Sequence, residues 1–200
     1  EVFADAGIAD IRLPYPLHAS NADRLIALAG RVRLSFIVDH PRVAGEWSAA
    51  LSRAGVTVDV LVKVDVGFQR CGIDPDPATA VPFIRRVAEL PGLRLRGLLS
   101  HAGQAYHAAS EAELREVAAS EAAILRALAA AARRAGVAIE ELSAGATPTA
   151  RFSLEEEGLT EYRPGNYVYC DRTQVDLGAA SIDDGALTVL ARVVSKPAAN

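Results

Sequence analysis

A lysine, an aspartate and an arginine stand in or just after a hydrophobic run, "VLVKVDVGFQRCGI", which has the composition of a β-strand and the loop that follows it. The period of two in a strand puts alternate valines on one face and Leu61, Lys63 and Asp65 on the other. A buried charge is costly unless it is paired, so an ion pair between Lys63 and Asp65 is the simplest interpretation. In a functional interpretation, Arg70 adds a planar, fork-shaped donor just beyond the strand end.

A histidine and a tyrosine follow the next expected strand, in "SHAGQAYH". His101 stands near Gly103 and Tyr106, where its ring could lie against a flat ligand. His18 and His40 also follow expected strands, and we interpret them as incidental to any site.

Two glycine-bearing turns, "SAGATPT" and "RPGN", follow late strands of the chain. Backbone N–H groups in such turns can converge on an anion, and the late loops of a barrel often hold a phosphate. Taken singly, Gly145 could be an ordinary turn glycine and Arg163 a surface ion-pair partner, because βα loops are normally polar. Four successive polar loops together favour a site for a phosphorylated ligand or cofactor.

Strand-like and helix-like segments alternate along the chain, which is the pattern of βα units in a parallel sheet. The expected strands are residues 10–14, 32–39, 58–66, 93–101, 139–143, 159–163 and 167–171. These strands predict a (β/α)8 barrel of the TIM type, which usually takes about 250 residues, so we expect its first β-α unit to lie upstream of Glu1. The polar residues above would then gather at the carboxyl ends of the strands, where such barrels carry their active sites.

The helices between the strands are predicted from caps and apolar spacing. Ser110 and Glu113 have the spacing of a capping box, and Gly136 suits the end of the long helix that follows. Shorter helices are expected over residues 19–29, 41–54 and 77–90.

The pattern changes after Gly178, because residues 186–197 have the composition of a strand with no helix behind it. We therefore expect an incomplete barrel over residues 1–178 and the start of a C-terminal β domain over residues 179–200.

Composition excludes several classes of protein. The 200 residues carry 21 basic and 25 acidic side chains, with a net charge of -4, and no basic run is longer than two residues. This balance disfavours a binder of nucleic acid or of a membrane surface. No apolar stretch is long enough for a membrane span and no signal pattern opens the chain, so we expect a cytoplasmic protein. Cys71 and Cys170 are isolated, so neither a disulfide framework nor a zinc knuckle is indicated.

Five motifs, in order, resemble the pyridoxal-phosphate enzymes of the alanine-racemase-like barrel, fold type III. The motifs are "DVGFQRCGI", "GLLSHAGQAYH", "LSAGATPT", "TEYRPGNYVYCDRTQ" and "LTVLARVVSKP", and they cover nearly the whole chain. Within the family the sequence is most similar to the D-threonine aldolase and D-serine dehydratase group. The resemblance implies a barrel that holds the cofactor, a C-terminal β domain, and a homodimer whose partner subunit helps to complete the site.

The resemblance also implies roles for individual residues. His101 would lie beside the pyridine ring, Tyr106 would reach the ring nitrogen, and Arg70 would face the phenolic oxygen or the substrate carboxylate. Lys63 and Asp65 would support Arg70 beneath the ring. His101 and Arg70 are therefore the candidate catalytic residues. The cofactor phosphate would be held by five residues of the two glycine turns, Gly145, Ala146, Thr147, Gly165 and Asn166.

Two features of the family have no counterpart in this sequence. The family's Schiff-base lysine sits on the first barrel strand, and neither Lys63 nor Lys196 is a good replacement; Lys63 instead occupies a place where alanine racemases carry a structural lysine. Relatives in the aldolase and dehydratase group also use a divalent metal, zinc or manganese, held in the C-terminal domain. His101 and His107 have no carboxylate or thiol at ligand spacing, so we predict no metal ligand in this chain. We expect the 200-residue chain alone to be inactive.

The resemblance implies a lyase that acts on a small D-3-hydroxy amino acid, of the D-threonine aldolase or D-serine dehydratase type. An amino-acid racemase of the same fold is an alternative, which Lys63 favours. Two further alternatives are a non-catalytic pyridoxal-phosphate-binding protein and, outside the family, a barrel enzyme for another phosphorylated metabolite.

Overall fold

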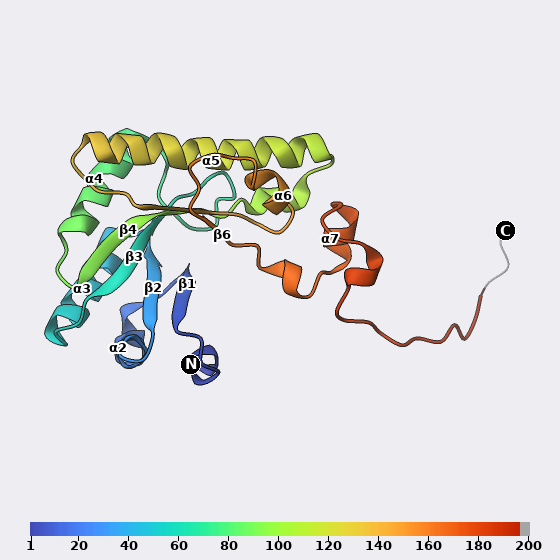
Figure 1. Cartoon of the computed structure of the whole chain (residues 1–200), viewed down its shortest axis with the longest axis horizontal. Helices are drawn as coiled ribbons and strands as arrows, with labels where there is room; N and C mark the ends of the chain where they lie inside the picture. Colours follow the sequence, from blue (N-terminus) through green and yellow to red (C-terminus); the bar gives the residue numbers. More distant parts are fainter. Residues whose placement is uncertain (197–200) are drawn as a thin grey trace.

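Six parallel strands form one sheet in which each strand pairs with the next along the chain (Figure 1). The computed structural model describes residues 1–196. Its strands are β1 (Asp10–Pro16), β2 (Arg33–Val38), β3 (Val58–Lys63), β4 (Leu93–Leu99), β5 (Glu141–Ala144) and β6 (Glu161–Tyr162). The sheet curls, because Arg12 on β1 forms ion pairs with Glu141 on β5 and Glu161 on β6. The result is part of a (β/α)8-type barrel, which confirms the predicted fold class.

Helices cover the outer face of the curled sheet, and the longest, α5, lies beside α4 on it (Figure 1). The helices are α1 (Val2–Asp5), α2 (Ala22–Ala29), α3 (Pro41–Arg53), α4 (Pro77–Glu89), α5 (Glu111–Arg134), α6 (Ala150–Ser153) and α7 (Arg172–Asp176). Short 3-10 turns occupy Ala19–Asn21, Gly103–His107, Asn166–Val168 and Ile182–Asp184. The helix predictions are confirmed to within a few residues at each end.

Local side-chain contacts fix where these helices begin. The Ser110 hydroxyl accepts the N–H of Glu113 at 3.2 Å, as a capping box requires, but the Glu113 carboxylate accepts the N–H of Ala109, one residue before the cap. His18 and His40 each accept a backbone N–H two residues ahead and so cap a 3-10 turn and α3. Their part in the fold is therefore structural, as expected.

The alternation of β3 is as predicted. Val60, Val62 and Val64 belong to the main hydrophobic core between the sheet and the helices. Leu61 points the opposite way and packs with Ile37 and Leu99 on the inner face of the curl. Lys63 therefore lies on the inner face, at the carboxyl end of the strand.

Two strand predictions are wrong. Residues 167–171 form part of a 3-10 turn and the cap of α7, because the N–H of Tyr167 donates to the Thr147 hydroxyl and Cys170 has a left-handed backbone with φ of 44°. Residues 186–196 adopt no regular secondary structure, since no strand of the described chain lies alongside to pair with them, and Pro197 lies outside the described residues. The chain after β6 extends away from the sheet (Figure 1). The division into residues 1–178 and 179–200 stays a prediction.

Lys63 is buried without the ion pair that the sequence suggested. Its side chain is only 3% exposed, and in the described part of the chain it forms no ion pair with Asp65. The Asp65 carboxylate instead accepts the N–H groups of Gly67 at 2.9 Å and Gln69 at 3.1 Å, because the chain turns directly after β3. Burial, reinforced by the positive charge of Arg163, lowers the pKa of Lys63 to about 8.

This burial predicts a specific pH dependence of stability. Between pH 8 and 10.5 the unfolded chain binds a proton at Lys63 that the folded protein does not, so stability rises with pH across this window. At pH 7, where Lys63 is charged in both states, burying this charge costs the folded protein about 3 kcal/mol of stability. Lys63→Met removes the buried charge and should be more stable than the wild type at pH 7. This difference in the free energy of unfolding, measured by urea unfolding, should shrink by about 3 kcal/mol between pH 7 and pH 10.5.

The exposed Lys196 provides the matched control. Lys196→Met should change stability by less than about 0.5 kcal/mol at both pH values. If the stability difference between Lys63→Met and the wild type is independent of pH, Lys63 does not carry a depressed pKa.

Candidate functional site

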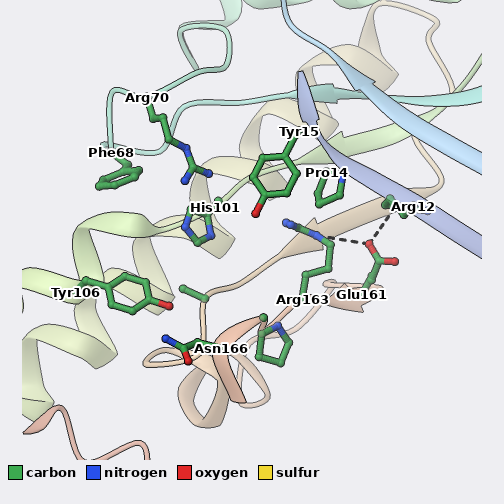
Figure 2. Close-up of a pocket in the computed structure, with 13 residues that line it drawn as sticks. Arg12, Pro14, Tyr15, Phe68, Arg70, His101, Tyr106, Glu161, Arg163 and Asn166 are labelled. Carbon is green, nitrogen blue, oxygen red and sulfur yellow. Dashed lines mark hydrogen bonds and ion pairs between the residues drawn. The ribbon is translucent and has the colours of Figure 1, made fainter. Parts of the chain in front are cut away.

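A cavity of about 610 Å³ opens at the carboxyl ends of the strands (Figure 2). Its wall comes from β1, from β6 and the loop after it, and from the loops after β3, β4 and β5. Of the eight residues predicted for the site, six line the cavity: Arg70, His101, Tyr106, Ala146, Gly165 and Asn166. The other two, Gly145 and Thr147, lie directly behind this wall and form hydrogen bonds to residues in it. The structure therefore brings the predicted residues together.

The loop after β3 presents Arg70 to the cavity. Asp65 holds the backbone of this loop through Gly67 and Gln69, so it supports Arg70 only indirectly, and the predicted direct support by Lys63 and Asp65 is not found among the described contacts. The Arg70 guanidinium lies 5.3 Å from the centre of the Phe68 ring. It forms no ion pair within residues 1–196, so its charge is available for an anionic ligand.

His101, just after β4, is held in one tautomer. Its Nδ1 lies 3.0 Å from the carbonyl oxygen of Gly145, and since a carbonyl only accepts, Nδ1 carries the hydrogen. Burial lowers the pKa of His101 to about 4, and the nearby charges of Lys63, Arg70 and Arg163 act in the same direction. His101 is therefore neutral near pH 7, with a free lone pair on Nε2.

The loop after β4 packs closely on the loop after β3. Gln104 donates to the carbonyl of Val66 at 2.8 Å, and the edge of the Phe68 ring meets His101 at a centroid distance of 6.0 Å. A Cβ on Gly103 would come within 2.4 Å of the Phe68 ring, so only glycine allows this contact. The Phe68 ring in turn limits the positions that His101 can take.

The two glycine turns are joined to each other through Thr147. The Thr147 hydroxyl accepts the N–H groups of Asn166 at 2.9 Å and Tyr167 at 3.2 Å. Gly145 has φ of 121°, a conformation that side chains disfavour, and its N–H donates to Glu121. At Gly165 nothing lies within 4 Å of the place that a Cβ would take. The N–H of Gly165 makes no hydrogen bond within residues 1–196, so the open space beside it can receive a phosphate.

An ion network closes the inner side of the cavity. Arg12 donates to Glu141 at 2.6 Å and to Glu161 at 2.9 Å, and Glu161 lies 3.6 Å from Arg163 (Figure 2). Arg163 also donates to the Ser143 hydroxyl at 2.6 Å, and burial lowers its pKa to about 10. Arg163 is thus a largely buried part of the site and not a surface ion-pair partner.

Sequence reasoning missed six of the cavity residues, Arg12, Pro14, Tyr15, Phe68, Glu161 and Pro164, and it named Arg163 without assigning it a role in the site. Arg12 and Glu161 are 149 residues apart, and only the curl of the sheet brings them together. A signal for Arg12 exists, since it is a charged residue inside an expected strand that ends at the same edge as the other polar residues.

The charges of the site favour anionic ligands. Arg12 and Arg163 are balanced by Glu141 and Glu161, whereas Lys63 and Arg70 have no carboxylate partner within ion-pair distance in the described chain. No group of three or more histidine, cysteine, aspartate or glutamate side chains within residues 1–196 could hold a metal ion. None of the described helices is long and apolar enough to cross a membrane.

Comparison with known proteins places this site in a family. Residues 5–173 match the family described as alanine racemase, N-terminal domain. The chain is 33% identical to the D-threonine aldolase of Arthrobacter sp. over 98% of its length and 52% of that protein. It is 32% identical to the D-threo-3-hydroxyaspartate dehydratase of Delftia sp. over 99% of its length and 52% of that protein. The chain thus spans about half the length of these curated relatives.

Solved structures agree with these similarities. The structure of D-threo-3-hydroxyaspartate dehydratase from Delftia sp. superimposes with a TM-score of 0.85 at 29% identity, over 92% of this chain and 49% of that one. The matched residues include both glycine turns and the loops that carry Arg70 and His101. The chain therefore belongs to the alanine racemase N-terminal domain family, the barrel family of pyridoxal-phosphate enzymes that its motifs resemble.

Proposed function

We propose that this chain is the cofactor-binding part of a pyridoxal-phosphate-dependent lyase that acts on D-3-hydroxy amino acids. The observation that carries the proposal is the similarity, over 98% and 99% of the chain, to an aldolase and a dehydratase named for D-threonine and D-threo-3-hydroxyaspartate. Both named substrates are D-amino acids with a hydroxyl on Cβ. The D configuration and the hydroxyl on Cβ define the proposed class of substrates.

The residues of the site fit pyridoxal phosphate. The cavity volume of about 610 Å³ lies within the usual range of small-molecule sites. Arg70 offers an unpaired positive charge, and the open space at Gly165 gives a phosphate access to the turn. His101 and Tyr106 supply planar and polar groups between these two anchors (Figure 2). We infer that Ala146, Gly165 and Asn166 contact the phosphate, while Gly145 and Thr147 hold the turns in shape.

Pyridoxal phosphate, when bound, supplies an electron sink for the negative charge that develops at the substrate Cα. The chain's own residues then bind and orient. Arg70 can hold a carboxylate or the phenolic oxygen through its planar fork of N–H groups. His101 presents Nε2 as an acceptor that can hold a proton, because its Nδ1–H is fixed on Gly145. The ion pairs of Arg12 and Arg163 fix the side chains that form the inner wall of the cavity.

Three further features are proposed for the full-length protein. A divalent metal, zinc or manganese, would be held by residues outside this chain and would bind the substrate hydroxyl. A second subunit would complete the site in a homodimer. The third proposal is a cytoplasmic location. These proposals come from the resemblance to the aldolase and dehydratase group.

A racemase of the same fold is the second candidate, and Lys63 is the observation that favours it. Lys63 lies beneath the site at the end of β3, where alanine racemases carry a structural lysine. Racemization needs a base on each face of Cα, so a tyrosine from the C-terminal domain opposite the cofactor lysine would favour a racemase.

Cofactor uptake and product analysis test the proposal. The full-length protein should bind pyridoxal phosphate, show a visible absorption band, and lose the band on borohydride reduction. D-threonine should give glycine and acetaldehyde if the protein is an aldolase, and D-serine should give pyruvate and ammonia if it is a dehydratase. EDTA should suppress either reaction. Interconversion of D- and L-amino acids without cleavage would instead identify a racemase, and a protein that takes up no cofactor would contradict the whole proposal.

Gly165 provides a test of the phosphate position. Its φ of -100° suits any residue, so Gly165→Val should fold normally while its side chain fills the open space beside the turn. Loss of one charge-assisted hydrogen bond corresponds to roughly 10- to 100-fold weaker binding. We expect the affinity for pyridoxal phosphate to fall by that factor, measured by absorption or fluorescence titration.

Gly45→Val is the matched control, because Gly45 also has open space at its Cβ position but lies on α3, away from the cavity. Its affinity for the cofactor should equal that of the wild type. Equal binding by Gly165→Val and Gly45→Val would show that the phosphate does not sit at this turn.

A further inference from the structure

Glu121 is a carboxylate in the middle of the apolar face of α5. The residue is 1% exposed, and its neighbours along the same helix face are Leu114, Ala118, Leu125 and Leu128. Packing of α5 on the sheet requires only apolar side chains here, and a buried carboxylate is costly. Burial accordingly raises the pKa of Glu121 above its usual range. The polar contacts of Glu121 therefore need an explanation beyond helix packing.

One oxygen of Glu121 makes both of its hydrogen bonds. Oε1 accepts the hydroxyl hydrogen of Ser100 at 2.6 Å and the N–H of Gly145 at 3.3 Å. Oε2 has no hydrogen-bond partner in the described chain. Arg163 and Lys63 are the charged groups nearby. Glu121 thus reaches from the outer helix to the ends of two neighbouring strands, β4 and β5.

Both contacts lead directly to the site. Gly145 donates its N–H to Glu121, and its carbonyl, on the other side of its Cα, accepts Nδ1–H of His101 at 3.0 Å. Ser100 immediately precedes His101, and its carbonyl accepts the guanidinium of Arg163. Glu121 therefore binds Gly145, in the first of the two glycine turns, and Ser100, which precedes the candidate catalytic residue His101.

We propose that Glu121 is a positioning residue of the cofactor site. Its carboxylate holds the N–H of Gly145 and so limits movement of the Gly145 backbone, so that the carbonyl on the other side of the Cα keeps His101 in the Nδ1–H tautomer and the turn keeps the shape that receives a phosphate. The inference rests on the proposed function, because it assigns Glu121 a role toward pyridoxal phosphate. A residue that served only helix packing would affect stability and would not distinguish a phosphorylated ligand from an unphosphorylated one.

The test compares two ligands that differ only in the phosphate. Dissociation constants of pyridoxal phosphate and of pyridoxal are measured for the full-length apoprotein and for Glu121→Leu, which keeps the volume and removes the acceptor. We expect pyridoxal phosphate to bind roughly tenfold more weakly to Glu121→Leu, the equivalent of one lost hydrogen bond, and pyridoxal to bind nearly as before. Glu121→Gln should retain most of the preference for pyridoxal phosphate over pyridoxal, because its amide oxygen can still accept both hydrogen bonds.

A second readout is the tautomer of His101, measured by ¹⁵N NMR of the imidazole in the ligand-free protein. The wild type and Glu121→Gln should show the Nδ1–H form, whereas Glu121→Leu should show a mixture of both tautomers. Glu116 is an exposed glutamate on the same helix, so Glu116→Leu should match the wild type in both readouts.

The outcomes separate this inference from the proposed function. If the wild type binds no pyridoxal phosphate, the proposed function fails. If the wild type binds it and Glu121→Leu folds with an unchanged ratio of the two dissociation constants and an unchanged tautomer, the positioning role is wrong. If Glu121→Leu does not fold, Glu121→Asp decides, because its shorter side chain withdraws the carboxylate from Gly145. A ratio within twofold of the wild type in Glu121→Asp would then overturn the inference.

Discussion

The backbone of Gly145 makes the contacts on which the rest of the site depends. Its carbonyl fixes His101, its N–H binds Glu121, and its missing side chain lets the chain approach the backbone nitrogen of Arg163, which a Cβ would meet at 3.2 Å. Arg163 in turn donates its own N–H to Ala144 at 2.9 Å. A single residue at the end of β5 thus connects the loop after β4, the outer helix α5 and strand β6. Any change that moves the backbone of Gly145 disturbs all three at once.

Burial is the second constraint: it is the main cause of the low pKa of His101, and the positive charges around the ring lower this pKa further. Arg163 and Lys63 both lie beneath the cavity, and each has a pKa that burial lowers. Their charges, with that of Arg70, disfavour a proton on His101. A neutral His101 donates from Nδ1 and accepts at Nε2, whereas a protonated ring would donate from both nitrogens. The cations therefore favour an acceptor in the cavity and at the same time attract an anionic ligand.

Sequence patterns predicted the strands through β6 and the main helices because local periodicity and caps determine these elements. They also predicted eight site residues, since the carboxyl ends of parallel strands meet at one edge. They did not predict Arg12 as a cavity residue, because its partners lie 129 and 149 residues away and meet it only through the curl of the sheet. The error at residues 167–171 has a similar cause, because the hydroxyl of Thr147 takes the N–H of Tyr167 that a strand would have used. Glu121 did carry a signal, since its spacing places it on the apolar stripe of α5.

Lys63 connects the stability of the barrel to the chemistry of the site. It is one of two lysines in the chain, yet it does not line the cavity, which agrees with the expectation that it is not the cofactor-binding lysine. Replacing it with an apolar residue would relieve the penalty of burying its charge. The same replacement would remove one of the charges that keep His101 neutral. Stability and the state of His101 thus place opposite demands on position 63, and the presence of a lysine there is consistent with the demand of the site.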